Sequence, residues 1–491
     1  MNNFKSLSIK GFIWNHLAKL SDYGLTYLIS VILARNLDSE SYGLFVTAYS
    51  IGTVLIILSS LGIDETINKY VSQFSANNKT GQIKKLLLTL FRYRLAAIVI
   101  ILLLVFLFRQ NISKIFNSES LSDYITVLVF FVFFQNLSNF FVQYFTALLN
   151  TRLVFFINTV LKLLSITSIL IYLTTNEDLY IILILISSIS FLSFVTYAFF
   201  AKQVLSYSSE NFNNHEVKNF SKIMWLNAIL SMVLGRYSDI FLLGLLIGIT
   251  TEISYYEIAF SLTTVIDYVF SVGLIGVIIS VFSATAVTDK SNILPIRNKI
   301  IKYYQFFVLP VMLFSLIFAS DLINMIYSDK YSAAIILFQV LLFYKIVIVN
   351  VFGSGLNISI LVSIGKQKYV FINRIILGII NIVLNIIFIP KYGALGAITI
   401  TGFVLLIIYF IDFVLVNLIV ELQYDLAFLI KNTILILPWL TVIYIINLSI
   451  NFNIIILSIV FFTGLMIIYY FFQKSMLIKI KEDIKLFFTK T

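Results

Sequence analysis

The sequence predicts an all-α integral membrane protein. The chain has 491 residues, of which 60% are hydrophobic and only 12% are charged, and its mean hydropathy is +1.01. A water-soluble protein of this composition would have too few polar side chains to cover its surface. Segments 98–108 and 180–192 are apolar on every helical face, as lipid-embedded helices are. The chain has no cysteine, which excludes disulfides and thiolate chemistry.

Fourteen segments have the length of a membrane-spanning helix, which needs about 20 mostly apolar residues. The first six are 12–33, 42–62, 87–108, 125–148, 154–173 and 179–200. The next six are 223–247, 256–283, 303–319, 333–361, 371–389 and 394–419, and the last two are 432–448 and 453–472. The first span contains His16, Lys19 and Asp22 and is followed by no evident small-residue cleavage site. We therefore expect a retained helix and not a signal peptide.

The basic residues orient these spans. With the N-terminus in the cytoplasm, we assign 25 of the 34 lysines and arginines to the cytoplasmic side, including Arg92, Arg94 and Arg374 near the cytoplasmic ends of spans, and four to the interiors of spans. Five fall in outer segments, namely Arg35, Arg109, Lys114, Lys330 and Lys391. This asymmetry follows the positive-inside rule and predicts that both termini are cytoplasmic. The net charge of +11 then reflects topology and attraction to anionic membrane lipids, not nucleic-acid binding.

Short matches at nearly constant spacing indicate an internal duplication. Lys-Leu-Ser-Asp at 19–22 resembles Arg-Tyr-Ser-Asp at 236–239, and Phe-Ile-Asn occurs at both 156–158 and 371–373. Because six spans is an even number, both copies would enter from the cytoplasm as parallel repeats. We predict two six-helix lobes around a central cavity, residues 1–201 and 202–420, followed by two further helices and a basic tail in 421–491.

We assign eight charged residues to the interiors of the predicted spans, and each would cost about 2.5–3.5 kcal/mol at the bilayer centre if it were unpaired. They must therefore face a polar cavity or one another. We predict that the cations bind an anionic substrate, and that the anions balance charge or couple transport to H⁺ or Na⁺. The cations are Lys162, Arg236, Lys345 and Lys19, and the anions are Asp239, Asp267, Asp22 and Asp412.

A simpler alternative exists for the two tetrapeptides. In each, the basic residue precedes the acidic residue by three positions, so the two side chains share a helix face and can neutralise each other. Lys19 can also extend its ammonium group to the membrane interface. By contrast, Lys162, Asp267 and Lys345 have no charged partner within one helical turn in the sequence. These three are therefore the stronger candidates for a polar cavity.

Enzymatic constellations are missing from the sequence. The two histidines, His16 and His215, and the lack of cysteine leave no metal-ligand cluster, and no glycine-rich segment has the spacing of a phosphate-binding loop. We expect a transporter without a cofactor, and not an enzyme.

Two segments resemble a known family. Leu-Ala-Arg-Asn-Leu-Asp-Ser-Glu-Ser-Tyr-Gly at 33–43 resembles the first-loop signature of polysaccharide biosynthesis flippases. Ile-Pro-Lys-Tyr-Gly-Ala-Leu-Gly-Ala at 389–397 resembles the loop between their eleventh and twelfth spans, and the 236–239 segment fits their seventh span. Together the motifs point to the multidrug/oligosaccharidyl-lipid/polysaccharide exporter superfamily, and within it to Wzx-type O-antigen flippases.

The resemblance implies two six-helix lobes, a cationic central cavity and alternating access. Such proteins move undecaprenyl-diphosphate-linked oligosaccharides from the inner to the outer face of the bacterial plasma membrane, and polysaccharide polymerase and chain-length proteins are expected partners. Many members are assigned twelve spans, whereas this sequence has fourteen, as do relatives such as lipid II flippases. The alternatives are a cation-coupled multidrug exporter of the same superfamily and, with less support, a membrane polysaccharide polymerase.

Overall fold

The computed structural model describes residues 2–206, 208–248, 251–271, 293–353, 355–420, 426–450 and 452–489, and every regular element in them is a helix. Eleven of these helices are long and apolar enough to cross a membrane, or twelve if the bent pair α9 (Asn214–Val233) and α10 (Arg236–Leu246) forms one span. The predicted all-α membrane class is confirmed.

Two features explain why this number is below the fourteen predicted spans. Helix α17 (Gln367–Val420) has 54 residues and includes both the eleventh and twelfth predicted spans. At 1.5 Å per residue it would be about 81 Å long if straight, but its backbone is non-helical at Gly393, where two helices meet at a kink. The predicted span 256–283 begins in α11 (Thr251–Ser271), and its remainder lies outside the described residues.

The chain forms two compact units. The first, here called the N-terminal unit, contains residues 10–261 and 371–404; the second, called the C-terminal unit, contains residues 1–9, 262–370 and 405–491. The sequence predicts a different division, into lobes 1–201 and 202–420 and a C-terminal part 421–491. That division is based on repeated spans and not on contacts, and it stays a prediction.

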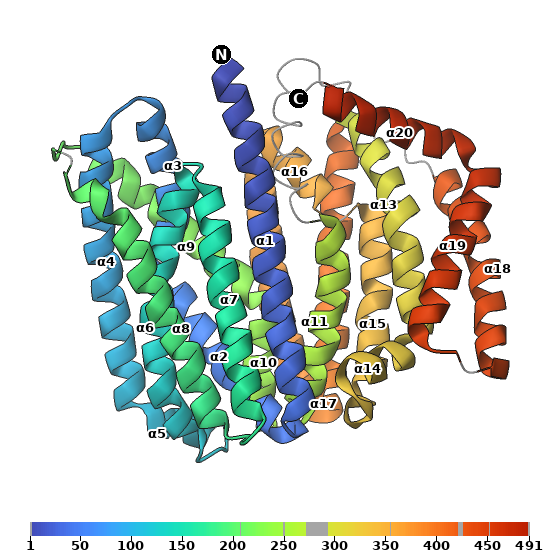
Figure 1. Cartoon of the computed structure of the whole chain (residues 1–491), viewed down its shortest axis with the longest axis horizontal. Coiled ribbons are helices and arrows are strands. Elements are labelled where there is room, and N and C mark those ends of the chain that lie inside the picture. Colours follow the sequence, from blue (N-terminus) through green and yellow to red (C-terminus); the bar gives the residue numbers. More distant parts are fainter. Residues whose placement is uncertain are drawn as a thin grey trace. The chain divides into compact units, whose positions relative to one another are not determined.

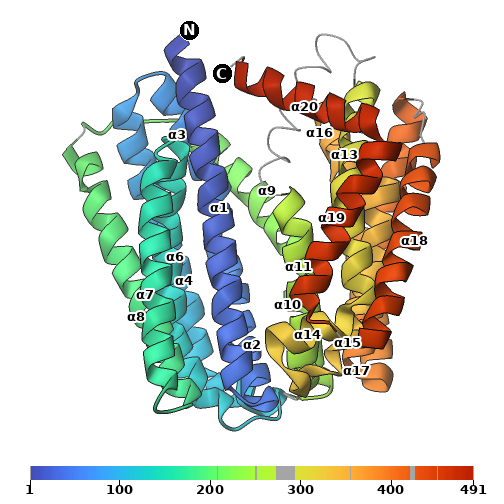
Figure 2. The same cartoon turned by 45° about the vertical axis from the view of Figure 1, so that its right-hand side comes forward.

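The N-terminal unit is a helical bundle in which α6 (Leu121–Ala147) packs along α8 (Leu179–Ala201), α2 (Ser39–Ser60), α3 (Ile63–Ala76) and α4 (Thr80–Leu107), as Figures 1 and 2 show. It also contains most of α1 (Asn2–Asn36), the short α5 (Arg109–Ile115), α7 (Thr151–Leu173) and the 3₁₀ turn η1 (Lys202–Ser206). Helix α9 joins this bundle because the Trp225 Nε1 donates to the Leu58 carbonyl over 3.0 Å and Ser221 Oγ donates to the Leu61 carbonyl over 2.7 Å.

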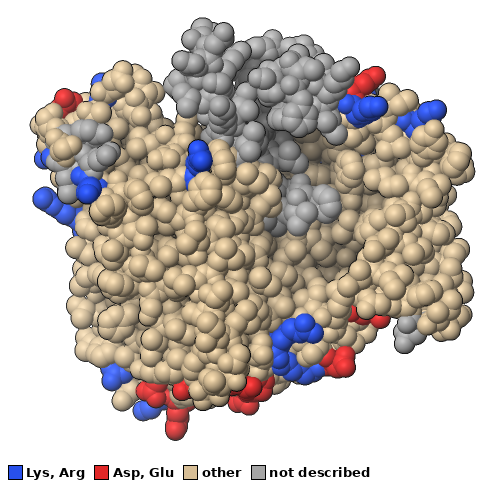
Figure 3. Space-filling model, viewed as in Figure 1, with Lys and Arg blue, Asp and Glu red and all other residues tan. Residues whose placement is uncertain are grey.

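The side wall of this unit is apolar. On the face drawn in Figure 3, charged side chains gather near the helix ends, and the wall formed by α4, α6, α7 and α8 between them carries none. Large hydrophobic side chains are exposed along these helices, including Leu107, Phe130, Val160 and Ile171. Exposed apolar surface of this extent is the surface that a bilayer covers.

The 33–43 motif forms a capped turn between α1 and α2. Leu33, Leu37 and Tyr42 are fully or almost fully buried. Asp38 is the N-cap of α2 and accepts hydrogen bonds from the backbone N–H groups of Glu40 and Ser41 over 2.9 and 2.8 Å. Partial burial raises the pKa of Asp38, but these bonds and the Ser41 hydroxyl outweigh it, so the pKa is lowered overall. The motif therefore fixes the angle between two helices.

The C-terminal unit has its own core. It contains α13 (Ile293–Ile317), α14 (Ala319–Tyr327), the 3₁₀ turn η3 (Asp329–Tyr331), α15 (Ala334–Val347), the π-helical turn η4 (Ile348–Phe352), α16 (Leu356–Ser363), α18 (Leu426–Ile450), α19 (Ile454–Phe472) and α20 (Lys474–Thr489). Phe306, Phe314, Leu440, Phe461 and Tyr469 pack together at its centre. Helix α20 runs across the end of α19 in both views (Figures 1 and 2) and places Met476, Leu477 and Ile480 on this core.

Candidate substrate-binding site

A polar cavity of about 570 Å³ lies inside the N-terminal unit. Helices α1, α2, α6, α7, α8, α10 and α11 contribute its walls. Four charged residues line it, namely Asp22, Lys162, Arg236 and Glu257, and their formal charges sum to zero. The cavity is thus charge-balanced, whereas the family resemblance implied a cationic one.

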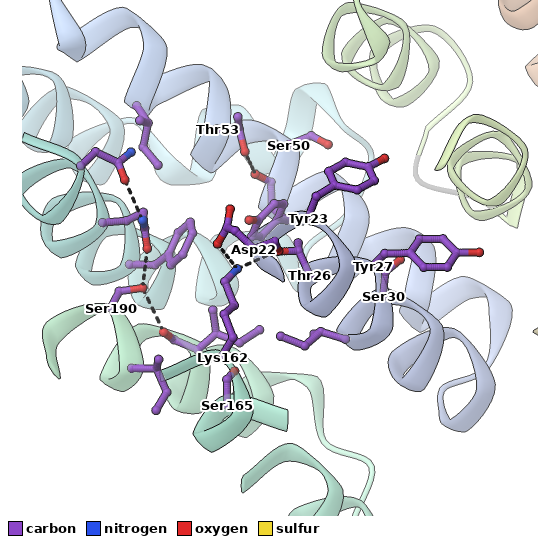
Figure 4. A pocket seen from close by; sticks show the side chains of 18 of the residues that line it. Asp22, Tyr23, Thr26, Tyr27, Ser30, Ser50, Thr53, Lys162, Ser165 and Ser190 are labelled. Atoms are coloured by element: carbon purple, nitrogen blue, oxygen red, sulfur yellow. Dashed lines mark hydrogen bonds and ion pairs between the residues drawn. The ribbon is translucent and has the colours of Figure 1, made fainter. Parts of the chain in front are cut away.

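Lys162 extends from α7 toward α1 (Figure 4). Its Nζ donates to Thr26 Oγ1 over 2.7 Å and lies 3.7 Å from Asp22 Oδ1. The Asp22 side chain is 48% exposed and that of Lys162 is 27% exposed. Asp22 therefore pairs with a lysine of another helix and not with Lys19, which was the alternative based on sequence. An ion pair this long and this open leaves both groups accessible to a ligand.

Arg236 begins α10 directly after the break in the seventh span. Helices α9 and α10 are bent by 57° relative to each other, and Gly235 between them is extended. Arg236 Nη1 donates to Glu257 Oε1 of α11 over 2.6 Å, and Nη2 donates to the Tyr237 hydroxyl over 3.2 Å. Arg236 therefore pairs with Glu257 and not with Asp239. Because the break leaves the first N–H groups of α10 without helical partners, it adds local positive potential beside this guanidinium.

The rest of the lining consists largely of hydroxyl, amide and aromatic side chains. Ser190 Oγ donates to Gln135 Oε1 over 3.1 Å, and Gln135 Nε2 donates to Asn139 Oδ1 over 2.9 Å. Tyr23 and Tyr27 extend from α1 on the same side, as Figure 4 shows. Further lining residues of these types are Ser30, Tyr42, Tyr49, Ser50, Thr53, Ser138, Asn158, Ser165, Ser193 and Tyr237. Such a surface can exchange hydrogen bonds with the hydroxyl groups of a sugar and place aromatic faces against its rings.

Asp239 lies one turn after Arg236 but is fully buried and does not line the cavity. Its Oδ2 accepts hydrogen bonds from the hydroxyls of Tyr256 and Thr401, both over 2.6 Å, and its Oδ1 accepts from Asn385 Nδ2 over 3.0 Å. No lysine or arginine among the described residues forms an ion pair with it. Asp239 is thus a buried carboxylate satisfied by uncharged donors.

The other predicted site residues lie elsewhere. Lys345 and Asp267 form an ion pair of 2.8 Å inside the C-terminal unit, although neither has a charged neighbour within one turn of its own helix. Lys19 is exposed on α1 and does not line the described cavity. Asp412 is fully buried in the C-terminal unit. The structure therefore brings Lys162, Asp22 and Arg236 together, and separates Asp239, Lys19, Asp412 and the Lys345–Asp267 pair from their cavity.

Sequence reasoning missed several charged residues that are buried here. Glu257 lies at the edge of the predicted eighth span and is not among the predicted site residues, and the sequence places Arg94 on the cytoplasmic side. Arg94 is fully buried, pairs with Asp64 and donates to Asn136 Oδ1. Each lies within about two turns of a span end, where a shift of a few residues decides whether a charge is inside. Glu257 directly follows the tyrosine pair 255–256 at the start of an apolar run, which is the signal that could have revealed it.

Residues 32–336, more than half of the chain, match the family described as "Polysaccharide biosynthesis protein". The chain belongs to this family. It is also similar to "Uncharacterized membrane protein MJ1068" of Methanocaldococcus jannaschii, with 22% identity over 449 residues that cover 86% of each chain.

Solved structures show the same fold. An inward-facing multidrug resistance MATE family transporter of the MOP superfamily superposes with a TM-score of 0.62 at 15% identity, over 83% of this chain and 94% of that one. The Vibrio cholerae MATE transporter VcmN in its bent form gives 0.54 at 18% identity, over 86% and 100% of the two chains. A MOP superfamily transporter from Pyrococcus furiosus, described as having a binding pocket of reverse polarity, gives a TM-score of 0.54 at 14% identity, over 84% and 96% of the two chains. The resemblance to the polysaccharide biosynthesis family seen in the sequence is confirmed, and the chain has the multi-helix fold of these MOP superfamily structures.

Proposed function

We propose that this protein moves a lipid-linked oligosaccharide from the cytoplasmic to the outer leaflet by alternating access. The observation that carries this proposal is the polar cavity within the membrane-spanning helices of the N-terminal unit. Its volume of about 570 Å³ lies in the range of small-molecule sites, and its hydroxyl, amide and tyrosine lining suits sugar rings. In this proposal Arg236 and Lys162 bind the negatively charged groups of the substrate.

In this proposal the protein spans a bacterial plasma membrane and has both of its termini in the cytoplasm. The substrate carrier is undecaprenyl diphosphate, and the oligosaccharide is a repeat unit of O-antigen or capsule. The family description, polysaccharide biosynthesis, supports this substrate class. Anionic membrane lipids, together with polysaccharide polymerase and chain-length proteins, are the proposed partners.

Transport in this scheme is coupled to H⁺ or Na⁺ through Asp239. This carboxylate is fully buried, and its three hydrogen-bond donors are all uncharged. A buried carboxylate without a cationic partner can accept a proton or a small cation at low electrostatic cost. Asp267 already has Lys345 as its partner, which makes it a charge-balancing residue in this proposal.

The proposal is tested by replacing Arg236 in cells that depend on this gene for surface glycan. Arg236→Ala should stop export and cause lipid-linked glycan to build up in the cytoplasmic leaflet, measured by leaflet-specific lectin labelling of spheroplasts. Because the single variant leaves Glu257 buried without its cation, the double variant R236A/E257A should be made as well, to separate lost binding from lost folding.

The matched control is Arg92→Ala, which removes an exposed arginine near the cavity-bearing bundle and should leave export unchanged. Normal export by both R236A and R236A/E257A, at normal protein level in the membrane, would contradict the assignment of this cavity to the substrate.

A second candidate is export of organic cations. The observation that favours it is Asp22, which is the most exposed member of the two cavity ion pairs at 48%. An exposed carboxylate beside tyrosine rings suits a cationic drug. A gene deletion that increases drug susceptibility but leaves surface glycan and its lipid-linked precursor unchanged would favour this candidate over the flippase.

A further inference from the structure

Glu257 is held by Arg236 through only one of its two carboxylate oxygens. Its side chain is 8% exposed, and its Oε1 accepts from Arg236 Nη1 over 2.6 Å. Its Oε2 is buried and has no hydrogen-bond partner among the described residues. Arg236 itself is 26% exposed and lines the cavity. A buried carboxylate oxygen without a donor is costly, because it loses the hydrogen bonds that water would supply.

The formal charge of the cavity constrains what can bind there. Lys162 and Arg236 are neutralised by Asp22 and Glu257, so an arriving anion would make the cavity negative by one charge inside a low-dielectric bundle. The charge stays at zero only if one internal carboxylate takes up a proton as the anion binds. Uptake of one proton compensates for one negative charge, which fits a monoanionic carboxylate and not a diphosphate with two or more charges.

We infer that Glu257 releases Arg236 to the carboxylate of an acidic sugar and is protonated in the same event. The proton comes from the bulk solution and forms an O–H bond on Glu257. Arg236 Nη1, which donated to Glu257, becomes free, and together with Nη2 it can form a bidentate contact with the sugar carboxylate. This inference rests on the proposed function and deepens it, because it names the class of sugar and the residue that senses it. Binding of substrate and uptake of a proton are then one coupled equilibrium.

Glu257 is better suited to this exchange than Asp22. Asp22 is half-exposed and 3.7 Å from Lys162, so water already screens its charge and little is gained when it is protonated. Glu257 is buried against its partner, so its charge depends on that single contact. The titratable groups that act on the Arg236–Glu257 pair come from four helices: Tyr23 of α1, Tyr49 of α2, Tyr237 of α10 and Tyr256 of α11.

The first experiment uses the unmodified protein. Phenyl β-glucuronide carries one carboxylate that stays ionised between pH 6 and 8, and phenyl β-glucoside is its neutral counterpart. Added to purified protein in weakly buffered detergent solution with a pH-indicator dye, the glucuronide should cause uptake of one proton per bound molecule, and the glucoside none. Its binding constant should rise about tenfold for each unit by which the pH is lowered, while binding of the glucoside stays constant.

The second experiment uses Glu257→Gln, with Glu252→Gln as the matched control. The glutamine of the E257Q variant can still accept a hydrogen bond from Arg236 but carries no charge, so glucuronide binding should become independent of pH and proton uptake should be lost. Glu252 also lies on α11, but its carboxylate accepts from the backbone N–H of Ala394 and does not line the cavity, so E252Q should behave as the unmodified protein does.

The outcomes separate the inference from the proposed function. If both glycosides bind to the unmodified protein but neither causes proton uptake, the role of Glu257 is wrong and the cavity remains a sugar site. If neither glycoside binds, the assignment of the cavity to a glycan fails and the inference fails with it. Equal pH dependence of glucuronide binding in the unmodified protein and in a folded E257Q variant would also overturn the inference.

Discussion

Asp239 is a single residue on which the coupling of transport can be tested. Its carboxylate is completely buried and accepts hydrogen bonds from Tyr256, Asn385 and Thr401. Asparagine can keep these contacts, because its amide oxygen accepts from Asn385 while its NH₂ group donates to the hydroxyls, which can also act as acceptors. Alanine cannot, and would leave buried donors unsatisfied at about 1–3 kcal/mol each.

We therefore predict that Asp239→Asn stays folded but loses the dependence of transport on a proton or sodium gradient. Asp239→Ala should in addition unfold at a lower temperature. Flipping assays in proteoliposomes with imposed gradients measure the first effect, and thermal unfolding in detergent measures the second. Glu119→Gln, which alters an exposed acidic residue, should change neither quantity. A D239N variant that responds to the gradient as the unmodified protein does would rule out Asp239 as the coupling residue.

At the scale of single residues, the sequence predicts which charged side chains are costly inside a membrane, but it does not predict which side chains they contact. Lys162 and Arg236 can be predicted because a charge in an apolar segment stands out. Their partners, Asp22 and Glu257, lie on other helices, and the contact depends on how these helices pack. The spacing of three residues in 19–22 and 236–239 suggested local pairs, but each of these acidic residues turns to another helix instead.

At the scale of elements, the kink in α17 depends on one glycine. Gly393 has φ +57° and ψ −139°, a conformation that residues with a side chain rarely adopt. A Cβ atom there would collide with the Glu252 carboxylate. That carboxylate accepts from the Ala394 N–H over 2.7 Å and so satisfies a backbone group at the start of the second half of α17. The predicted span ends at 389 and 394 bracket this residue, because proline and glycine mark the break in the sequence.

Gly393→Ala should therefore destabilise the protein by about 1–3 kcal/mol through backbone strain and displacement of Glu252. Gly24→Ala is the matched control, because Gly24 lies within α1 and nothing is within 4 Å of an added Cβ there. It should be neutral or slightly stabilising, since alanine favours a helix more than glycine does. Thermal unfolding of both variants in the same detergent compares them, and equal unfolding temperatures would show that the kink does not need glycine.

Two buried arginines occupy similar settings in the two units. Arg94 donates from Nε to the side-chain oxygen of Asn136, with its guanidinium 5.9 Å from the Phe140 ring. Arg297 donates from Nε to the side-chain oxygen of Asn357 over 2.9 Å, with its guanidinium 5.7 Å from the Phe413 ring. Arg94 lies in the third predicted span and Arg297 lies shortly before the ninth, so the two arginines do not have the spacing of the repeated sequence segments. The similarity is therefore one of local setting, and the duplication stays a prediction.

At the scale of the whole molecule, the orientation in the membrane can be tested directly because the chain has no cysteine. A single cysteine introduced at Ser75, after the second span, should lie in the cytoplasm. One introduced at Glu177, after the fifth span, should lie outside. Both residues are exposed, so neither substitution should disturb the core. A membrane-impermeant maleimide should label E177C in intact cells and S75C only after permeabilisation, and the reverse pattern would invert the predicted topology.

The membrane class and most spans could be predicted because a bilayer imposes a simple length and composition on every helix that crosses it. No comparable rule of length or composition predicts which side chains meet inside the helical bundle. Glu257 and Arg94 lie near span ends, where the hydropathy signal is weak, and the cavity is lined by residues from seven helices that no local pattern connects. The neutral charge of the cavity therefore emerged only when these residues were placed together.

The contact between Arg236 and Glu257 also bears on how the chain is inserted during synthesis. The two residues lie at the beginnings of consecutive helices, α10 and α11, and only a short connection separates these helices. Each charge entering lipid alone would oppose insertion by about 2.5–3.5 kcal/mol at the membrane centre. If α10 and α11 leave the translocon together as a hairpin, Arg236 and Glu257 enter the lipid as a neutral ion pair and not as two separate charges. The same pair that faces the substrate can thus lower the barrier to biogenesis.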